Sequence, residues 1–84
     1  DLAALEKQLR TLQADAATRI SAAASTVELD ELGSSLLGKR GAITEILRGI
    51  GALPADDRPK IGVVANEVRA AIDASVSARR VALS

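Results

Sequence analysis

The sequence contains no cysteine, histidine, methionine or aromatic residue among its 84 positions. Without cysteine there can be no disulfide framework, and without cysteine or histidine the usual zinc-binding sets cannot be assembled. The same absences remove the common nucleophile–base pairs of covalent catalysis. We therefore expect neither a metal site nor a catalytic site in this segment. The lack of thiols also fits a cytoplasmic location.

The missing aromatic side chains also restrict the fold and its partners. Compact cores usually draw much of their buried area from aromatic rings, whereas the apolar residues here are Ala, Leu, Ile and Val. Such side chains suit thin seams between helices. Because there are no rings on which nucleic-acid bases could stack, any RNA binding would have to use the phosphate backbone and the shape of the RNA. Such binding weakens as the salt concentration rises.

Long apolar runs are absent too. No run approaches the roughly 20 residues that cross a bilayer, and no signal-peptide pattern is present, so we expect no membrane partner. The formal net charge is zero, with 11 basic and 11 acidic residues. Residues 1–38 hold three basic and six acidic residues, whereas residues 39–84 hold eight and five. A nucleic acid would therefore have to meet a local basic face.

Apolar residues at three- and four-residue steps predict three helices. We expect these helices over about residues 2–24, 27–50 and 56–83. The connections between them are short, so neighbouring helices should alternate in direction. The predicted fold is all-α: an elongated antiparallel coiled-coil hairpin of the second and third helices, with an additional N-terminal helix packed alongside. Ser25 or Thr26 is expected to cap the second helix.

The second predicted helix has one weak place. Apolar residues recur every seven positions at Leu29, Leu36, Ile43 and Ile50. The same heptad puts Lys39 where an apolar residue is expected, and Gly38 and Gly41 flank it. Each glycine costs about 1 kcal/mol in a helix interior. Either the helix bends here, or a second chain approaches closely, or Lys39 extends its charge out of the seam.

A turn should separate the second and third helices. Gly51 is expected to end the second helix in a left-handed conformation. Pro54 indicates a chain reversal, because the residue before a proline disfavours helix. Asp56 and Asp57 suit the positive end of the third helix, and Pro59 fits its first turn without losing a hydrogen bond.

These glycines, prolines and charges form an ordered set of motifs. The set comprises Leu36-Leu37-Gly38-Lys39-Arg40-Gly41, Ile43-Thr44, Leu53-Pro54-Ala55-Asp56-Asp57-Arg58, Gly62 followed by Asn66-Glu67, and Ala78-Arg79 followed by Leu83. In this order and at these intervals, it resembles the N-terminal helical arm of the bacterial phenylalanyl-tRNA synthetase alpha subunit. The resemblance covers about residues 29–83. Leu36 stands where the family usually has an aromatic residue, and Arg40 replaces a lysine.

The resemblance implies a function for the segment. In that family the alpha subunit joins a beta subunit in an (alpha-beta)2 heterotetramer, which attaches phenylalanine to tRNA(Phe) with ATP and magnesium. The arm contacts the body of the tRNA, and the phenylalanine, ATP and magnesium sites lie in a downstream catalytic domain. Residues 1–84 would then be a single helical arm domain of a larger chain, with no catalytic residue, metal or cofactor of its own, that positions tRNA(Phe) for aminoacylation.

The resemblance also implies which residues act. The predicted contacts to RNA phosphates are Lys39 and Arg40, followed by Arg58 and Lys60 near the turn. The residues predicted to shape the backbone are Gly38, Gly41 and Pro54. From the residues alone, a solvated pair of charges at a helix bend is the more common explanation of Lys39 and Arg40. The alternative function is a coiled-coil spacer or protein–protein module without RNA binding, which the heptads of residues 2–23 motivate. The isolated segment would then self-associate.

Overall fold

The structure, a computed structural model, describes residues 1–38 and 40–84. These residues form the helices α1 (Leu2–Ala22), α2 (Thr26–Leu37), α3 (Ala42–Leu47) and α4 (Arg58–Leu83), and the short 3₁₀ helix η1 (Arg48–Ala52). Within the two described ranges there is no strand. The predicted all-α class is confirmed. None of the described helices is both long and apolar enough to span a membrane.

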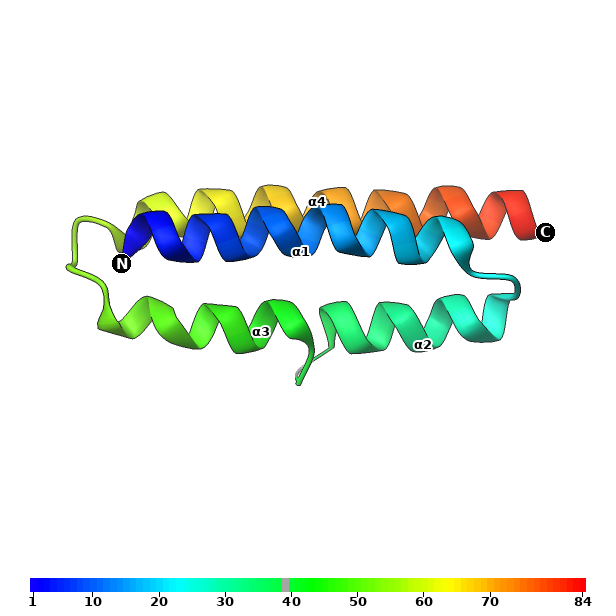
Figure 1. Ribbon diagram of the computed structural model, residues 1–84, viewed down its shortest axis with the longest axis horizontal. Coiled ribbons are helices and arrows are strands. Elements are labelled where there is room, and N and C mark those ends of the chain that lie inside the picture. The colour runs from blue at the N-terminus through cyan, green and yellow to red at the C-terminus, as the bar shows by residue number, and fades with distance from the viewer. Residues whose placement is uncertain (39) are drawn as a thin grey trace.

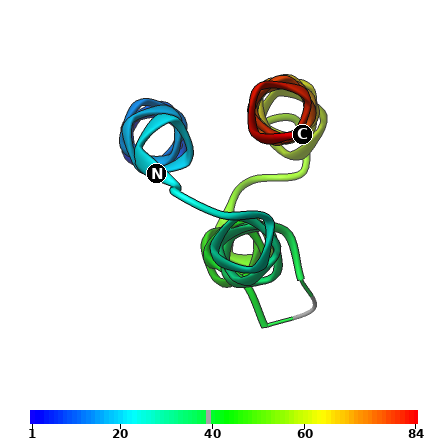
Figure 2. The same cartoon turned by 90° about the vertical axis from the view of Figure 1, so that its right-hand side faces the viewer.

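The helices lie side by side as three rods (Figure 1 and Figure 2). One rod consists of α2 followed by α3, and the other two are α1 and α4. Both α1 and α4 run opposite to α2 and α3, so they run in the same direction as each other. The whole measures 45 × 18 × 15 Å. The most extensive packing is between α1 and α4, so the N-terminal helix is a full member of a three-rod bundle.

Side-chain caps fix where the first two helices begin. The Asp1 carboxylate accepts a hydrogen bond of 2.8 Å from the Ala4 amide at the start of α1. Ser25 caps α2 as expected, because its hydroxyl accepts a 3.2 Å bond from the Glu28 amide. The Glu28 carboxylate reaches back and accepts a 3.1 Å bond from the Ala24 amide. These bonds satisfy amides that the first helical turn leaves without partners.

The core consists of aliphatic side chains. In the described part of the chain no polar or charged residue is buried. The largest fully buried side chains are Leu9, Ile20, Leu29, Ile43, Ile61, Val68 and Ile72. They come from all three rods, and each contributes about 1.5–3 kcal/mol through its burial. The bundle therefore depends on a thin aliphatic seam, as the absence of aromatic residues indicates.

The second predicted helix is not continuous, and the prediction of one helix over residues 27–50 is wrong. The helix α2 ends at Leu37, and α3 begins at Ala42. Gly38 (φ −69°, ψ 172°) and Gly41 (φ −76°, ψ 172°) both have an extended backbone. The heptad nevertheless persists across the break, because Leu36 and Ile43 are both buried in the same core. The position predicted for Lys39 in the seam lies outside the described residues.

The connection to α4 also differs from the prediction. Gly51 is not left-handed, because no described residue has a positive φ. After α3 the helix instead tightens into η1, a common way to use terminal carbonyls. The Asp57 amide then donates a 2.9 Å bond to the Pro54 carbonyl. The last helix begins at Arg58, two residues later than predicted, with Pro59 in its first turn.

Candidate nucleic-acid interface

The break between α2 and α3 places Arg40 on the surface. Arg40 is exposed and lies at a shallow depression whose other lining residues are Asp30, Glu31, Ser34, Ser35 and Gly38. In the described residues its guanidinium makes no hydrogen bond or ion pair. Lys39, the other predicted phosphate contact at this break, lies outside the described residues. Arg40 is thus a cation held at the middle of the rod without an observed partner.

Close backbone contacts build this break. A β-carbon at Gly38 would lie 2.5 Å from the Ser34 carbonyl oxygen, and one at Gly41 would lie 2.9 Å from the Leu36 carbonyl oxygen. The Gly38 carbonyl accepts two hydrogen bonds, one of 2.9 Å from the Gly41 amide and one of 3.1 Å from the Thr44 hydroxyl. Glycine is therefore required here for space and not for a positive φ.

Arg58 has partners within the chain. Its Nε donates a 3.2 Å bond to the Leu53 carbonyl, and its Nη2 donates a 3.2 Å bond to the Gly51 carbonyl. These carbonyls belong to the end of η1 and the residue that follows it. Leu53, just before Pro54, is extended (φ −81°, ψ 152°), as expected for a residue that precedes proline. Arg58 thus holds the connection between η1 and α4 closed.

Lys60 lies two residues after Arg58, and its side chain has a weaker contact within the chain. Its Nζ lies 3.7 Å from the Asp57 carboxylate, and its side chain is 66% exposed. Arg58 and Lys60 belong to the first turn of α4, which begins at one end of the bundle, whereas the connection between α2 and α3 lies near the middle of its rod (Figure 1). The structure therefore does not bring Arg40 together with Arg58 and Lys60 in one cluster.

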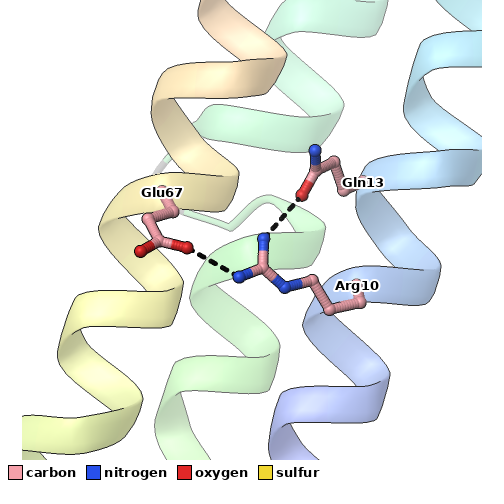
Figure 3. A network of polar contacts seen from close by, with 3 residues as sticks. All are labelled: Arg10, Gln13 and Glu67. Carbon is pink, nitrogen blue, oxygen red and sulfur yellow. Dashed lines mark hydrogen bonds and ion pairs between the residues drawn. The ribbon is translucent and has the colours of Figure 1, made fainter.

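Two ion pairs and one carbonyl contact tie the rods together. Arg10 of α1 donates a 2.6 Å bond to Glu67 of α4 and a 3.1 Å bond to Gln13 of its own helix (Figure 3). Arg80 of α4 bonds Asp30 of α2 at 2.6 Å. Arg79 of α4 provides the carbonyl contact.

That residue, Arg79, donates two hydrogen bonds to one backbone oxygen. Its Nε and Nη2 lie 3.0 Å and 2.8 Å from the Ala23 carbonyl, which follows α1. The motif cation Arg79 therefore joins the end of α1 to α4. From the sequence, its partner could not be identified, because Ala23 offers only a backbone carbonyl.

Among the described residues, Arg69 is a further cation that makes no hydrogen bond or ion pair. It is exposed on α4 and lines a shallow depression with Leu37, Asn66, Ala70 and Asp73. In the sequence, Arg69 belongs to none of the quoted motifs and is one of eight basic residues in positions 39–84. The available signal was its place between the core positions Val68 and Ile72, which directs it outward. Its neighbour Asp73, four residues on, would instead suggest an ion pair, which the described residues do not form.

The described surface offers no enclosed cavity that would suit a small-molecule ligand. Its depressions are shallow, and the one between α1 and α3 is lined by Lys7, Gln8, Thr11, Leu12, Asp15 and Ile46. Within residues 1–38 and 40–84 no group of three or more carboxylates could hold a metal ion.

Comparisons with known proteins point to one family. The family described as "Aminoacyl tRNA synthetase class II, N-terminal domain" matches residues 24–84. The chain is 43% identical over 79 residues to "Phenylalanine--tRNA ligase alpha subunit" of Geobacillus thermodenitrificans, which covers 94% of this chain and 23% of that protein. It is 43% identical over 75 residues to the protein of the same description from Desulforamulus reducens, covering 89% of this chain and 22% of that protein.

A third relative carries the same description. It comes from Listeria monocytogenes and is 42% identical over 74 residues, which cover 88% of this chain and 21% of that protein. The chain thus spans less than a quarter of the length of these relatives (23%, 22% and 21%). No solved structure matches the chain.

Proposed function

Because the chain belongs to the family of class II aminoacyl-tRNA synthetase N-terminal domains, we propose that it is the tRNA-binding arm of a phenylalanine–tRNA ligase alpha subunit. The observation that carries the proposal is its similarity, over 94% of its length, to a protein described as that subunit. In this role the arm contacts the body of tRNA(Phe) through backbone phosphates and positions it for aminoacylation. Catalysis takes place in another domain, which uses ATP and magnesium.

The proposal extends to the rest of the enzyme. The alpha subunit joins a beta subunit in an (alpha-beta)2 heterotetramer. Within it the arm extends to contact the tRNA and takes no part in catalysis. The elongated shape, 45 Å by 18 Å by 15 Å, supports this role. A rod of this length spans several nucleotides of an RNA backbone, and its surface has the exposed arginines that phosphate contacts need.

The phosphate contacts proposed from the sequence differ in how available they are. Arg40 is exposed and has no partner in the described residues, so it can donate to a phosphate without breaking a contact. Lys39 is proposed beside it. Arg58 would have to release the Gly51 and Leu53 carbonyls, and Lys60 would have to move from Asp57. The contacts at the α2–α3 break are therefore the primary ones.

The alternative function, a self-associating coiled-coil spacer, has weaker support. Its motive is the heptad pattern of residues 2–23. That seam is already used within the chain, because Leu9, Ala16 and Ile20 are buried against the other rods. A second copy would have to displace α4 or the α2–α3 rod from α1.

A titration with tRNA(Phe) at low and at moderate salt tests the proposal. The wild type is compared with Lys39→Glu/Arg40→Glu and with a control, Lys7→Glu/Arg19→Glu, which changes the net charge equally on α1. We expect binding that weakens with salt, is lost in the first variant and persists in the control. Equal binding by all three proteins, or none by the wild type, would contradict an RNA contact at the break.

A further inference from the structure

We propose that α4 shares the RNA contact, with Arg69 as a second phosphate-binding residue and Asn66 as a neutral donor beside it. This inference rests on the proposed function, because it names a further part of the same RNA-binding surface. It places the RNA backbone across two rods, from the α2–α3 break to the depression that the end of α2 shares with α4. Three observations lead to it.

The first observation is which cations remain available. Of the 11 cations in the sequence, ten lie in the described residues. Seven of these bond to carboxylates or to backbone carbonyls of the chain: Arg10, Arg19, Arg48, Arg58, Lys60, Arg79 and Arg80. In the described ranges, three make no such contact, namely Lys7, Arg40 and Arg69. An external anion can reach these three without competing against a contact already formed.

The second observation is where the three cations lie. Arg69 shares its depression with Leu37, the last residue of α2. Arg40 shares its depression with Gly38, the next residue of the chain. The two depressions are thus lined by consecutive residues at the end of α2. Lys7 lies apart, in the depression between α1 and α3.

The third observation is the chemistry of the side chains. A guanidinium presents several donors in a planar fork that matches a phosphate group. Asn66 is exposed beside Arg69 and adds a neutral amide donor. Asp73 lines the same depression and has no ion pair in the described residues. Its negative charge opposes a phosphate, so the arrangement favours a backbone that passes on the Asn66 side of Arg69.

Single neutral substitutions test this surface in the complete natural chain. The variants are Arg69→Gln, Arg40→Gln and the control Lys7→Gln, each titrated with an unmodified tRNA(Phe) transcript between 50 and 200 mM salt. Loss of one charge-assisted phosphate contact should weaken binding about tenfold at low salt. It should also lower the slope of log K against log salt by about one. Lys7→Gln should bind within about twofold of the wild type, because Lys7 lies on another face. Thermal unfolding of each variant verifies the fold.

The outcomes separate this inference from the proposed function. If Arg40→Gln weakens binding and Arg69→Gln binds like the wild type, the arm function stands and the role of α4 is refuted. If the wild type itself does not bind, the proposed function fails. If Lys7→Gln weakens binding as much as Arg69→Gln, the effect is one of net charge and the specific surface is wrong. Asp73→Asn should tighten binding a few-fold, and unchanged affinity in that variant would contradict a phosphate beside Arg69.

Discussion

Gly33 lies within α2 and Gly38 directly follows it, and the two glycines differ in the space around them. A β-carbon at Gly38 would meet the Ser34 carbonyl oxygen at 2.5 Å, whereas one at Gly33 would meet nothing within 4 Å. Gly38→Ala should therefore destabilise the bundle by about 1–3 kcal/mol, as overpacking does. Gly33→Ala should stabilise it by roughly 0.5–1 kcal/mol, because alanine loses less backbone entropy in a helix. Urea unfolding of the two variants, read as midpoints at constant m-value, compares them.

A second pair of glycines allows the same comparison. Gly41→Ala should behave like Gly38→Ala, since its β-carbon would lie 2.9 Å from Leu36 backbone atoms, and Gly62→Ala should behave like Gly33→Ala. If all four variants shift the midpoint in the same direction, the close contacts at the α2–α3 break do not set the requirement for glycine.

Arg58 and Lys60 carry the same charge but should contribute differently to stability. Arg58→Gln removes two hydrogen bonds to the Leu53 and Gly51 carbonyls, and bonds to charged donors are worth about 1.5–3 kcal/mol. Lys60→Gln removes only an exposed ion pair of 3.7 Å, worth about 0–1 kcal/mol. We expect Arg58→Gln to lower Tm by at least about 4 °C and Lys60→Gln to leave it nearly unchanged in a calorimetric scan. Similar losses in both would show that the two carbonyl contacts add little.

The sequence predicted the individual residues unevenly, and the reason is physical. The heptad drew attention to Lys39 at a seam position and to the two glycines near it, and the family resemblance added Arg40 as a predicted phosphate contact. The sequence could not predict the partners of Arg58 and Arg79, because these are backbone carbonyls at Gly51, Leu53 and Ala23. Any residue provides a carbonyl, and only the three-dimensional path of the chain makes these three available.

At the scale of elements, the α2–α3 break is held by one side chain from the following helix. The Thr44 hydroxyl donates a 3.1 Å bond to the Gly38 carbonyl, which also accepts the Gly41 amide. Thr44→Val keeps the size of the side chain and removes this donor, so it should cost about 1 kcal/mol. Thr44→Ser keeps the hydroxyl and should recover most of that loss. Amide hydrogen exchange at Gly41 would report the loosening of the break directly.

A structural role for Thr44 in the break has a distinct signature. Exchange at Gly41 should accelerate in Thr44→Val, while amides in the middle of α1 stay protected. Uniform acceleration throughout the bundle would mean that the substitution acts on global stability and not on the break.

The elements themselves were largely predictable, apart from this break and the turn before α4. Heptad spacing predicted one apolar face of Leu29, Leu36, Ile43 and Ile50. The first three are buried in the core, and Ile50 is partly buried against it. The break was offered only as one of several possibilities, because a glycine in a helix costs about 1 kcal/mol, an amount that packing on both sides can offset. What decides the matter is the pair of extended conformations at Gly38 and Gly41, which periodicity does not reveal.

At the scale of the whole molecule, the all-α bundle followed from the sequence but the ranking of its contacts did not. The expected hairpin pairs the last helix mainly with the second, whereas α4 packs most extensively on α1. Stripes of small aliphatic residues fit one another in several combinations, because none has the shape of an aromatic ring. The choice is aided by contacts such as Arg79 with the carbonyl of Ala23.

The buried aliphatic side chains and the exposed ion pairs should contribute very differently to the stability of the entire bundle. Arg10 and Glu67 join α1 to α4 at 2.6 Å, but their side chains are 45% and 54% exposed, and such pairs contribute about 0.2–1 kcal/mol. Ile72 is fully enclosed among the rods (1% exposed), and truncation of such a side chain costs about 2–5 kcal/mol. A double-mutant cycle of Arg10→Gln and Glu67→Gln should therefore give a coupling free energy below about 1 kcal/mol. Ile72→Ala should remove several times as much stability. Denaturation at two salt concentrations completes the experiment, and the free energy of unfolding of the wild type should change little between them. A large loss of stability in high salt would mean that charge pairs and not the aliphatic seam hold the rods together. A coupling free energy as large as the Ile72→Ala effect would mean the same.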